Sequence, residues 1–332
     1  MILMGAFASG SFGLFLKRSR KWEWEHVWLI YSFFGMLLIP WVLGLATVPG
    51  LLQVLASANA GDLTRVFLYG LGWGIGAVLY GLALKFVGLA LSYAIVMGLT
   101  AAVGSLAPLI LLHRQELPTL RGLLIVGGVA LIVLGVVSSS WAGYLKTKVL
   151  SHSAAPDQGQ PRHRFVPGLI AAILSGVLSP MLNLSFAYGR PLAERATQNG
   201  AASLFAPNII WVVALSAGFI ANAAYCSYLI VRNQSTKLLL RHPKEYGVAL
   251  IMALLWSAGY IFYGIGGSSL DDLAAVVGWP LMSTVTILSA SFWGAISGEW
   301  RGSGLQSRLV MGAAVALLCV GMVVVGSSET IR

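Results

Sequence analysis

Charged side chains are scarce in this sequence. Only 10% of its 332 residues are Asp, Glu, Lys or Arg, whereas a soluble globular chain has about 25%. Hydrophobic residues make up 58%, and the mean hydropathy is +0.83. This composition excludes an ordinary soluble domain. Because the few charges also leave long stretches untouched, the chain is predicted to be an all-α integral membrane protein.

Cysteine, histidine and acidic residues are also few. The two cysteines, Cys226 and Cys319, lie in apolar stretches and are expected to be small buried hydrophobes rather than disulfide partners or metal ligands. His152 and His163 have no cluster of Cys or carboxylates beside them, so neither a metal nor a cofactor is expected. An enzyme needs a nucleophile with a base, or metal ligands, converging on one site. The apolar stretches offer neither, and we expect no enzymatic activity.

Ten stretches contain no Asp, Glu, Lys, Arg or His, and each is predicted to be a membrane span. The first, 1–16, covers about 24 Å at 1.5 Å per residue, against ~30 Å of hydrocarbon. Either the bilayer thins around it, or Met1 lies inside a longer natural start. Its small residues favour close helix packing. The stretches are 1–16, 27–48, 66–84, 87–112, 122–143, 165–188, 204–231, 246–267, 273–297 and 309–326.

The net charge of +10 is spread over short loops and does not form one basic face, which argues against nucleic acid as a partner. Fifteen of the 21 lysines and arginines follow spans 1, 3, 5, 7 and 9. The positive-inside rule therefore predicts that these loops are cytoplasmic and that both termini lie outside. Trp22, Trp24 and Trp28, beside the first basic loop, are expected to form an interfacial belt.

Several landmarks recur at a nearly constant offset, which indicates a duplication. W-G-I-G-A-V-L-Y-G at 73–81 returns as W-S-A-G-Y-I-F-Y-G at 256–264, 183 positions later. Glu116 returns as Glu299 at the same offset, and V-A-L-I-V-L-G at 129–135 returns as V-A-L-L-C-V-G at 315–321, shifted by 186. Chance matches between apolar helices are the competing explanation, but a shared offset disfavours it.

The duplication predicts three regions: a first five-helix repeat at 1–143, a polar cytoplasmic linker at 144–164, and a second five-helix repeat at 165–332. Because five spans reverse the direction of the chain, the second copy enters the bilayer upside down. Ten transmembrane helices in two inverted five-helix repeats are typical of secondary transporters, whose substrate site lies near the midplane between the copies.

Polar and aromatic side chains within the spans are the candidate substrate ligands, because such groups tend to face the bundle or a wet cavity. Ser175, Ser179 and Asn183 share one helix face, and Pro180 and Pro280 are expected to interrupt their helices. A serine that bonds its own backbone, or an aromatic at the headgroup level, is the alternative for each residue. Aromatic faces with amides and hydroxyls suit a sugar. The candidates are Trp73, Tyr80, Ser179, Asn183, Trp256, Tyr260, Tyr263, Trp279 and Ser283.

No carboxylate or histidine lies inside these stretches, which indicates a neutral substrate and leaves few places for a coupled proton. Asp271 and Asp272, adjacent at the entrance to span 9, are the best candidates for proton coupling. A solvated loop pair is the alternative interpretation. The other titratable residues near helix ends are expected to be caps or interface pairs, namely Glu25, His26, Glu116, Glu194 and Glu299.

Glycines at 70, 72, 74 and 76 predict a close helix–helix contact rather than a nucleotide loop, because no strand precedes them. The chain also resembles the L-rhamnose/proton symporter family of the drug/metabolite transporter superfamily. Four motifs carry this resemblance: K-W-E-W-E at 21–25, W-G-I-G-x-x-x-Y-G at 73–81, the Asn222–Cys226 region and Glu299–Trp300. The resemblance implies ten helices, an inverted repeat, a bacterial inner-membrane location and proton-driven uptake of a 6-deoxyhexose.

Uptake of a neutral monosaccharide is therefore the expected function, with a sugar, a proton and the lipid bilayer as partners. Export of another small metabolite or amphipathic compound, which occurs in the wider superfamily, is the alternative.

Overall fold

The computed structural model describes residues 1–16, 19, 21–87, 89–151, 165–268, 273–298 and 300–330, and these residues form helices and turns without a strand. The elements are α1 (Ile2–Ser11), α2 (Gly13–Leu16), α3 (Trp24–Ser32), the π-helix η1 (Phe33–Leu38), α4 (Ile39–Thr47), α5 (Leu51–Ser57), α6 (Ala60–Val87), α7 (Leu89–Leu112), the 3-10 helix η2 (Arg114–Glu116), α8 (Leu120–Ser151), α9 (Phe165–Leu178), α10 (Met181–Tyr188), α11 (Arg190–Gln198), α12 (Asn208–Arg232), α13 (Lys237–Arg241), α14 (Lys244–Gly267), α15 (Ala274–Ile296), α16 (Leu305–Ser327) and the 3-10 helix η4 (Ser328–Thr330).

Nine helical stretches in the described part of the chain are long and apolar enough to cross a membrane. They account for nine of the ten predicted spans. The remaining one corresponds to α1, an apolar helix of only 10 residues followed by the one-turn helix α2. Five spans begin earlier than their uncharged stretches: they start at Trp24, Ala60, Leu120, Lys244 and Leu305. Titratable residues, among them Glu25, His26 and Glu245, therefore lie inside membrane-spanning helices.

Two prolines expected to interrupt helices behave differently. Pro180 separates α9 from α10, as predicted. Pro280 does not break its helix, because α15 continues through it from Ala274 to Ile296. The expected break there is wrong. A proline costs one backbone hydrogen bond, and packing in a membrane helix bundle can compensate for it.

The chain separates into two compact units, and each draws on both halves of the sequence. Unit 1 comprises Met1–Ile75 and Met181–Gly278, and unit 2 comprises Gly76–Pro180 and Trp279–Arg332. The unit boundaries fall within α6 and α15 and between α9 and α10. The predicted linker begins as helix, because α8 extends to Ser151; the remainder of it, 152–164, lies outside the described residues.

In unit 1, glycines allow helices to pack closely. A Cβ atom on Gly5 of α1 would lie 2.7 Å from the carbonyl oxygen of Ala258 in α14, so only glycine fits there. A Cβ on Gly74 of α6 would lie 2.6 Å from Cα of Gly218 in α12. The close contacts expected of the first helix and of the glycine-rich segment are thus confirmed.

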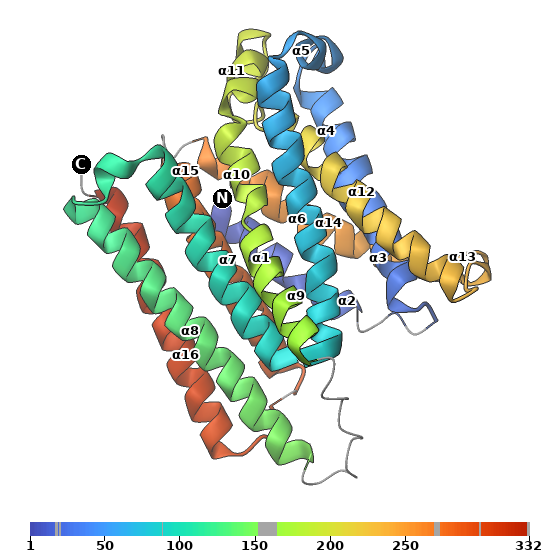
Figure 1. The fold of residues 1–332 in the computed structure, drawn as a ribbon, viewed down its shortest axis with the longest axis vertical. Helices are drawn as coiled ribbons and strands as arrows, with labels where there is room; N and C mark the ends of the chain where they lie inside the picture. The colour runs from blue at the N-terminus through green and yellow to red at the C-terminus, as the bar shows by residue number, and fades with distance from the viewer. Residues whose placement is uncertain are drawn as a thin grey trace. The chain divides into compact units, whose positions relative to one another are not determined.

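In unit 2, α8 and α16 pack along each other and run in opposite directions (Figure 1). Arg121 at the start of α8 pairs with Glu329, just beyond the end of α16, at 2.9 Å. Further along, Gly135 of α8 lies against Leu318 of α16, because a Cβ added to this glycine would lie 2.8 Å from the leucine Cγ. The segments 129–135 and 315–321, which correspond in the repeat, therefore lie in an antiparallel helix pair.

Candidate functional site

Trp73 and Trp256, which correspond in the sequence repeat, stack on each other in unit 1. Their ring centroids are 5.8 Å apart and their planes meet at 13°. α6 supplies Trp73 and α14 supplies Trp256. The Trp73 ring packs on Gly218 of α12, where an added Cβ would lie 2.7 Å from ring atoms. Both indoles are half-buried, so each keeps some exposed surface.

Trp256 also contacts two tyrosines. Its ring meets Tyr260, one turn further along α14, edge-on at 5.3 Å, and Tyr31 of α3 at 5.8 Å and 73°. The Tyr260 hydroxyl donates to the carbonyl oxygen of Gly35 at 3.3 Å, which ties α14 to the π-helical turn η1. Edge-to-face contacts of this kind add about 0.5–1.5 kcal/mol beyond area burial. Contacts with α3 and η1 therefore hold Trp256 and Tyr260 of α14 in place.

Asn183 and Tyr263 form a buried polar pair beside this set. The Tyr263 hydroxyl donates to Oδ1 of Asn183 at 2.6 Å, and the Asn183 amide donates to the carbonyl oxygen of Ala275 at 2.8 Å. Asn183 has no exposed surface, and Tyr263 is 1% exposed. The pair thus joins α10, α14 and the beginning of α15. We call Trp73, Trp256, Tyr260, Tyr263 and Asn183 the aromatic–amide set.

The other four predicted site residues belong to unit 2. Trp279 is buried, and its Nε1 donates to the carbonyl oxygen of Thr100 at 3.3 Å. Tyr80 packs beside the apolar cluster that includes Ala83 and Val96. Ser179 and Ser283 are half-buried. The expected stripe of Ser175, Ser179 and Asn183 on one helix is not continuous, because the helix breaks at Pro180. The Ser175 hydroxyl donates to the carbonyl oxygen of Gly76 at 2.8 Å.

Two aromatic residues outside the predicted set also belong to this neighbourhood of unit 1. Tyr31 is 2% exposed and Trp211 is 1% exposed. Trp211 stacks on Phe186 at 5.5 Å and 14° and lies 5.7 Å from Tyr260. Its Nε1 donor has no hydrogen-bond partner in the described part of the chain. The sequence could have identified Tyr31, because the spacing of Trp24, Trp28 and Tyr31 puts them on one face of a helix.

The interfacial belt expected at Trp22, Trp24 and Trp28 is only partly a surface feature. Trp22 is 6% exposed, and its Nε1 donates to the carbonyl oxygen of Leu238 at 3.0 Å. Trp24 and Trp28 stack at 5.2 Å, and Nε1 of Trp28 donates to Oδ1 of Asn222 at 2.9 Å. Tertiary hydrogen bonds therefore draw Trp22 and Trp28 inward, which composition alone does not reveal.

The titratable residues expected at helix ends divide into two groups. Glu116 accepts a hydrogen bond from Thr119 at 3.3 Å, and Glu194 pairs with Arg190 at 3.0 Å on the exposed face of α11, as expected of local pairs. Glu25 and His26 differ, because they are 7% and 0% exposed and no side-chain cap bond forms at the start of α3. They are therefore not caps; Glu25 instead accepts a hydrogen bond from Asn233 at 2.7 Å, in keeping with the alternative expectation of a pair. Asp271, Asp272 and Glu299 lie outside the described residues.

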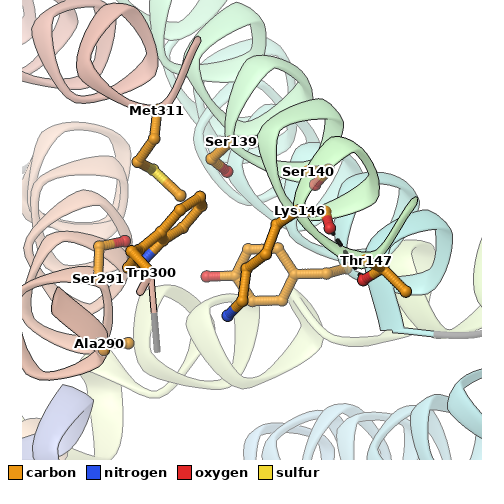
Figure 2. Close-up of a pocket in the computed structure, with 11 residues that line it drawn as sticks. Ser139, Ser140, Lys146, Thr147, Ala290, Ser291, Trp300 and Met311 are labelled. Atoms are coloured by element: carbon orange, nitrogen blue, oxygen red, sulfur yellow. Dashed lines mark hydrogen bonds between the residues drawn. The ribbon is translucent and has the colours of Figure 1, made fainter. Parts of the chain in front are cut away.

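Unit 2 contains a pocket of about 270 Å³ between α7, α8, α15 and α16 (Figure 2). Nζ of Lys146 lies 5.0 Å from the centroid of the Trp300 ring, a cation–π distance. Hydroxyls of Ser139, Ser140 and Thr147 also line the pocket, each donating to a backbone carbonyl of α8. The pocket includes none of the predicted sugar ligands.

The family model and the similar curated proteins point to the same family. The model of the family described as L-rhamnose-proton symport protein (RhaT) matches residues 1–331. Similar curated proteins include the L-rhamnose-proton symporters of Yersinia pestis (strain Pestoides F) and of Yersinia pseudotuberculosis serotype O:1b (strain IP 31758). Each is 28% identical over 332 residues, covering 97% of this chain and 93% of the relative.

Proposed function

The chain belongs to the L-rhamnose-proton symport family, a family of transporters rather than enzymes, and from this premise we propose that it takes up a neutral 6-deoxyhexose such as L-rhamnose by proton symport. It is a multi-pass membrane protein whose similar relatives are bacterial symporters. We place it in a bacterial inner membrane. The family description and the uncharged character of the aromatic–amide set support this choice of substrate.

The proposed architecture is ten transmembrane helices in two inverted five-helix repeats, with α1 as the first span. The support comes from unit 2, where α8 and α16 are repeat counterparts and run antiparallel. Counterparts in an inverted repeat have opposite directions in the membrane. Alternating access would then arise from rearrangement of two equivalent copies around a central sugar.

The proposed orientation has both termini on the periplasmic side. It rests on the distribution of lysine and arginine, which are concentrated in the loops after the odd-numbered spans. Under this orientation, the ends of α8 and α12 and the beginning of α14 face the cytoplasm.

The stack of Trp73 on Trp256 is the observation that carries the sugar proposal. Pyranose rings present apolar C–H faces that pack on indole, while their hydroxyls need donors and acceptors. Covering about 100 Å² of exposed indole would contribute about 2.5 kcal/mol at 25 cal/mol per Å². Nε1 of Trp211, which has no hydrogen-bond partner among the described residues, is a donor in the same neighbourhood. Asn183 and Tyr263 supply further polar atoms. The predicted ligands of unit 2 stay predictions.

Purified protein in liposomes tests the function directly. Uptake of radiolabelled L-rhamnose and L-fucose is measured with and without a pH gradient, alongside sugar counterflow at equal pH. The proposal expects counterflow in both conditions and accumulation only with the outside acidic. Empty liposomes provide the background. Absence of monosaccharide transport, together with efflux of a different solute, would support the exporter alternative instead.

A further inference from the structure

Glu245 is a buried carboxylate in unit 1. It lies in the first turn of α14 and is 8% exposed. Among the described residues it makes no ion pair, and its Oε2 atom is fully covered without a hydrogen bond. The N-terminal end of a helix favours a negative charge only modestly. A buried polar atom without a partner is uncommon in folded proteins, which makes this carboxyl a candidate functional group.

His26 is a second buried titratable residue, and one of its ring nitrogens has no hydrogen-bond partner among the described residues. Its side chain has no exposed surface, and Nε2 lies 3.1 Å from the carbonyl oxygen of Ser235. A carbonyl only accepts, so Nε2 carries the hydrogen in this contact. Nδ1 is then the basic nitrogen. It is buried and has no hydrogen-bond partner in the described part of the chain.

Trp22 connects the surroundings of these two groups. Its ring lies 6.4 Å from the His26 ring and meets Tyr246, the neighbour of Glu245, edge-on at 4.8 Å. Helices α3 and α14 also pack against each other. His26 and Tyr246, the residue next to Glu245, therefore both lie beside the Trp22 ring in unit 1.

Other titratable and charged groups occupy the elements around this region. Glu25 of α3 is buried, and its Oε1 accepts a hydrogen bond from Asn233 at 2.7 Å. Cys226 of α12 is buried. The charged side chains of the surrounding elements are exposed, and none of the ion pairs among the described residues includes Glu245. On the preceding segment, on α12, on α13 and at the start of α14 these are Lys21, Glu23, Arg232, Lys237, Arg241 and Lys244, with half-buried His242 and Tyr246 beside them.

We propose that Glu245 and His26 form the proton-binding pair of this transporter. A proton from water on one side of the membrane adds to the Glu245 carboxylate or to the lone pair of His26 Nδ1, and it leaves to water on the other side. Only an O–H or N–H bond forms and breaks. The inference rests on the proposed symport function and places coupling in the described part of unit 1 instead of at Asp271 and Asp272.

Helix α14 carries Glu245 and three members of the aromatic–amide set, and α3, which carries His26, contacts that set. Glu245 and Trp256 are both on α14, about 17 Å apart along its axis at 1.5 Å per residue. On α3, His26 is followed by Tyr31, which contacts Trp256 at 5.8 Å. The proton and the sugar therefore do not touch. Their coupling requires that protonation shift the positions of α3 and α14, which the sugar site then senses.

The test compares E245Q and H26Q with the wild type in liposomes. Glutamine keeps the size of the glutamate, and in H26Q its amide can still donate to Ser235. A gradient of one pH unit supports about tenfold accumulation at one proton per sugar. We expect both variants to lose this accumulation while counterflow stays within about twofold. We also expect L-rhamnose to cause no alkalinisation of a weakly buffered suspension of cells expressing E245Q.

Matched controls are E194Q, on the exposed face of α11, and H113Q in unit 2, both of which should accumulate sugar normally. Full accumulation by E245Q would overturn the proposal. Loss of accumulation by D271N/D272N, with E245Q and H26Q still accumulating sugar, would overturn it as well. Loss of counterflow in an E245Q protein that melts at the wild-type temperature would also overturn it, because Glu245 would then act in translocation itself. Failure of wild-type counterflow would refute the symport function instead.

Discussion

Trp73 and Trp256 stack with their ring planes 13° apart, although 183 positions separate them in the sequence. They occupy corresponding places in the two sequence repeats and contact each other within unit 1. The repeat thus brings two copies of one motif together at a half-buried aromatic surface. That surface is where we propose the apolar face of the sugar binds.

Replacement of Trp256 by alanine tests this surface. We expect W256A to weaken L-rhamnose binding by about 10- to 100-fold, since roughly 1.4–2.8 kcal/mol of apolar contact is lost. W73A should have a similar effect. Equilibrium binding of radiolabelled sugar to purified protein gives the affinity.

The control for these variants is W141A, because Trp141 is 55% exposed on α8 and stacks on Tyr144 at 5.3 Å, outside the aromatic–amide set. Wild-type affinity in both W256A and W73A would refute the assignment.

The Asn183–Tyr263 hydrogen bond should matter for both stability and binding. N183A removes the acceptor that the Tyr263 hydroxyl meets at 2.6 Å and leaves it a longer contact, 3.4 Å, with the carbonyl oxygen of Ala274. The loss is expected to cost about 1–3 kcal/mol of unfolding free energy. Y263F removes only the donor and should cost less. Thermal unfolding in detergent measures both effects. Sugar affinity should fall in N183A, and a variant with unchanged melting temperature and unchanged affinity would contradict both roles.

The contact between α6 and α12 depends on Gly74. G74A places a methyl group 2.6 Å from Cα of Gly218, and overpacking of this kind costs about 1–3 kcal/mol. G127A is the matched control, because a Cβ there meets nothing within 4 Å. Removing a helical glycine can stabilise by up to about 1 kcal/mol. We therefore expect a lower melting temperature for G74A and an equal or higher one for G127A. The reverse order would contradict the close contact.

The antiparallel pairing of α8 and α16 can be tested by cross-linking. In a background of C226A and C319A, we expect R121C and E329C to be joined by a short bifunctional thiol reagent, since the native side chains meet at 2.9 Å. R121C with Q306C is the control, because Gln306 lies at the far end of α16, about 33 Å away along a 23-residue helix. Cross-linking of the control pair and not of the test pair would indicate parallel helices and remove the support for inversion.

The amino-acid sequence by itself determined the class of the protein. Freedom from charge over whole spans is a local property, so the helical membrane architecture, the tight glycine contacts and the family resemblance were all predictable. The repeat pointed to Trp73 and Trp256. It did not reveal that their rings stack.

Only the tertiary structure decided which polar groups are buried and what they contact. Glu25, His26 and Glu245 border the uncharged stretches in the sequence, yet the folded chain buries all three. Trp22 and Trp28 look like interfacial residues, but they donate to Leu238 and Asn222, which lie about two hundred positions away. Hydropathy along the chain depends on each residue alone. The burial of a residue depends on which distant helix packs against it, and this is decided by how whole helices pack together.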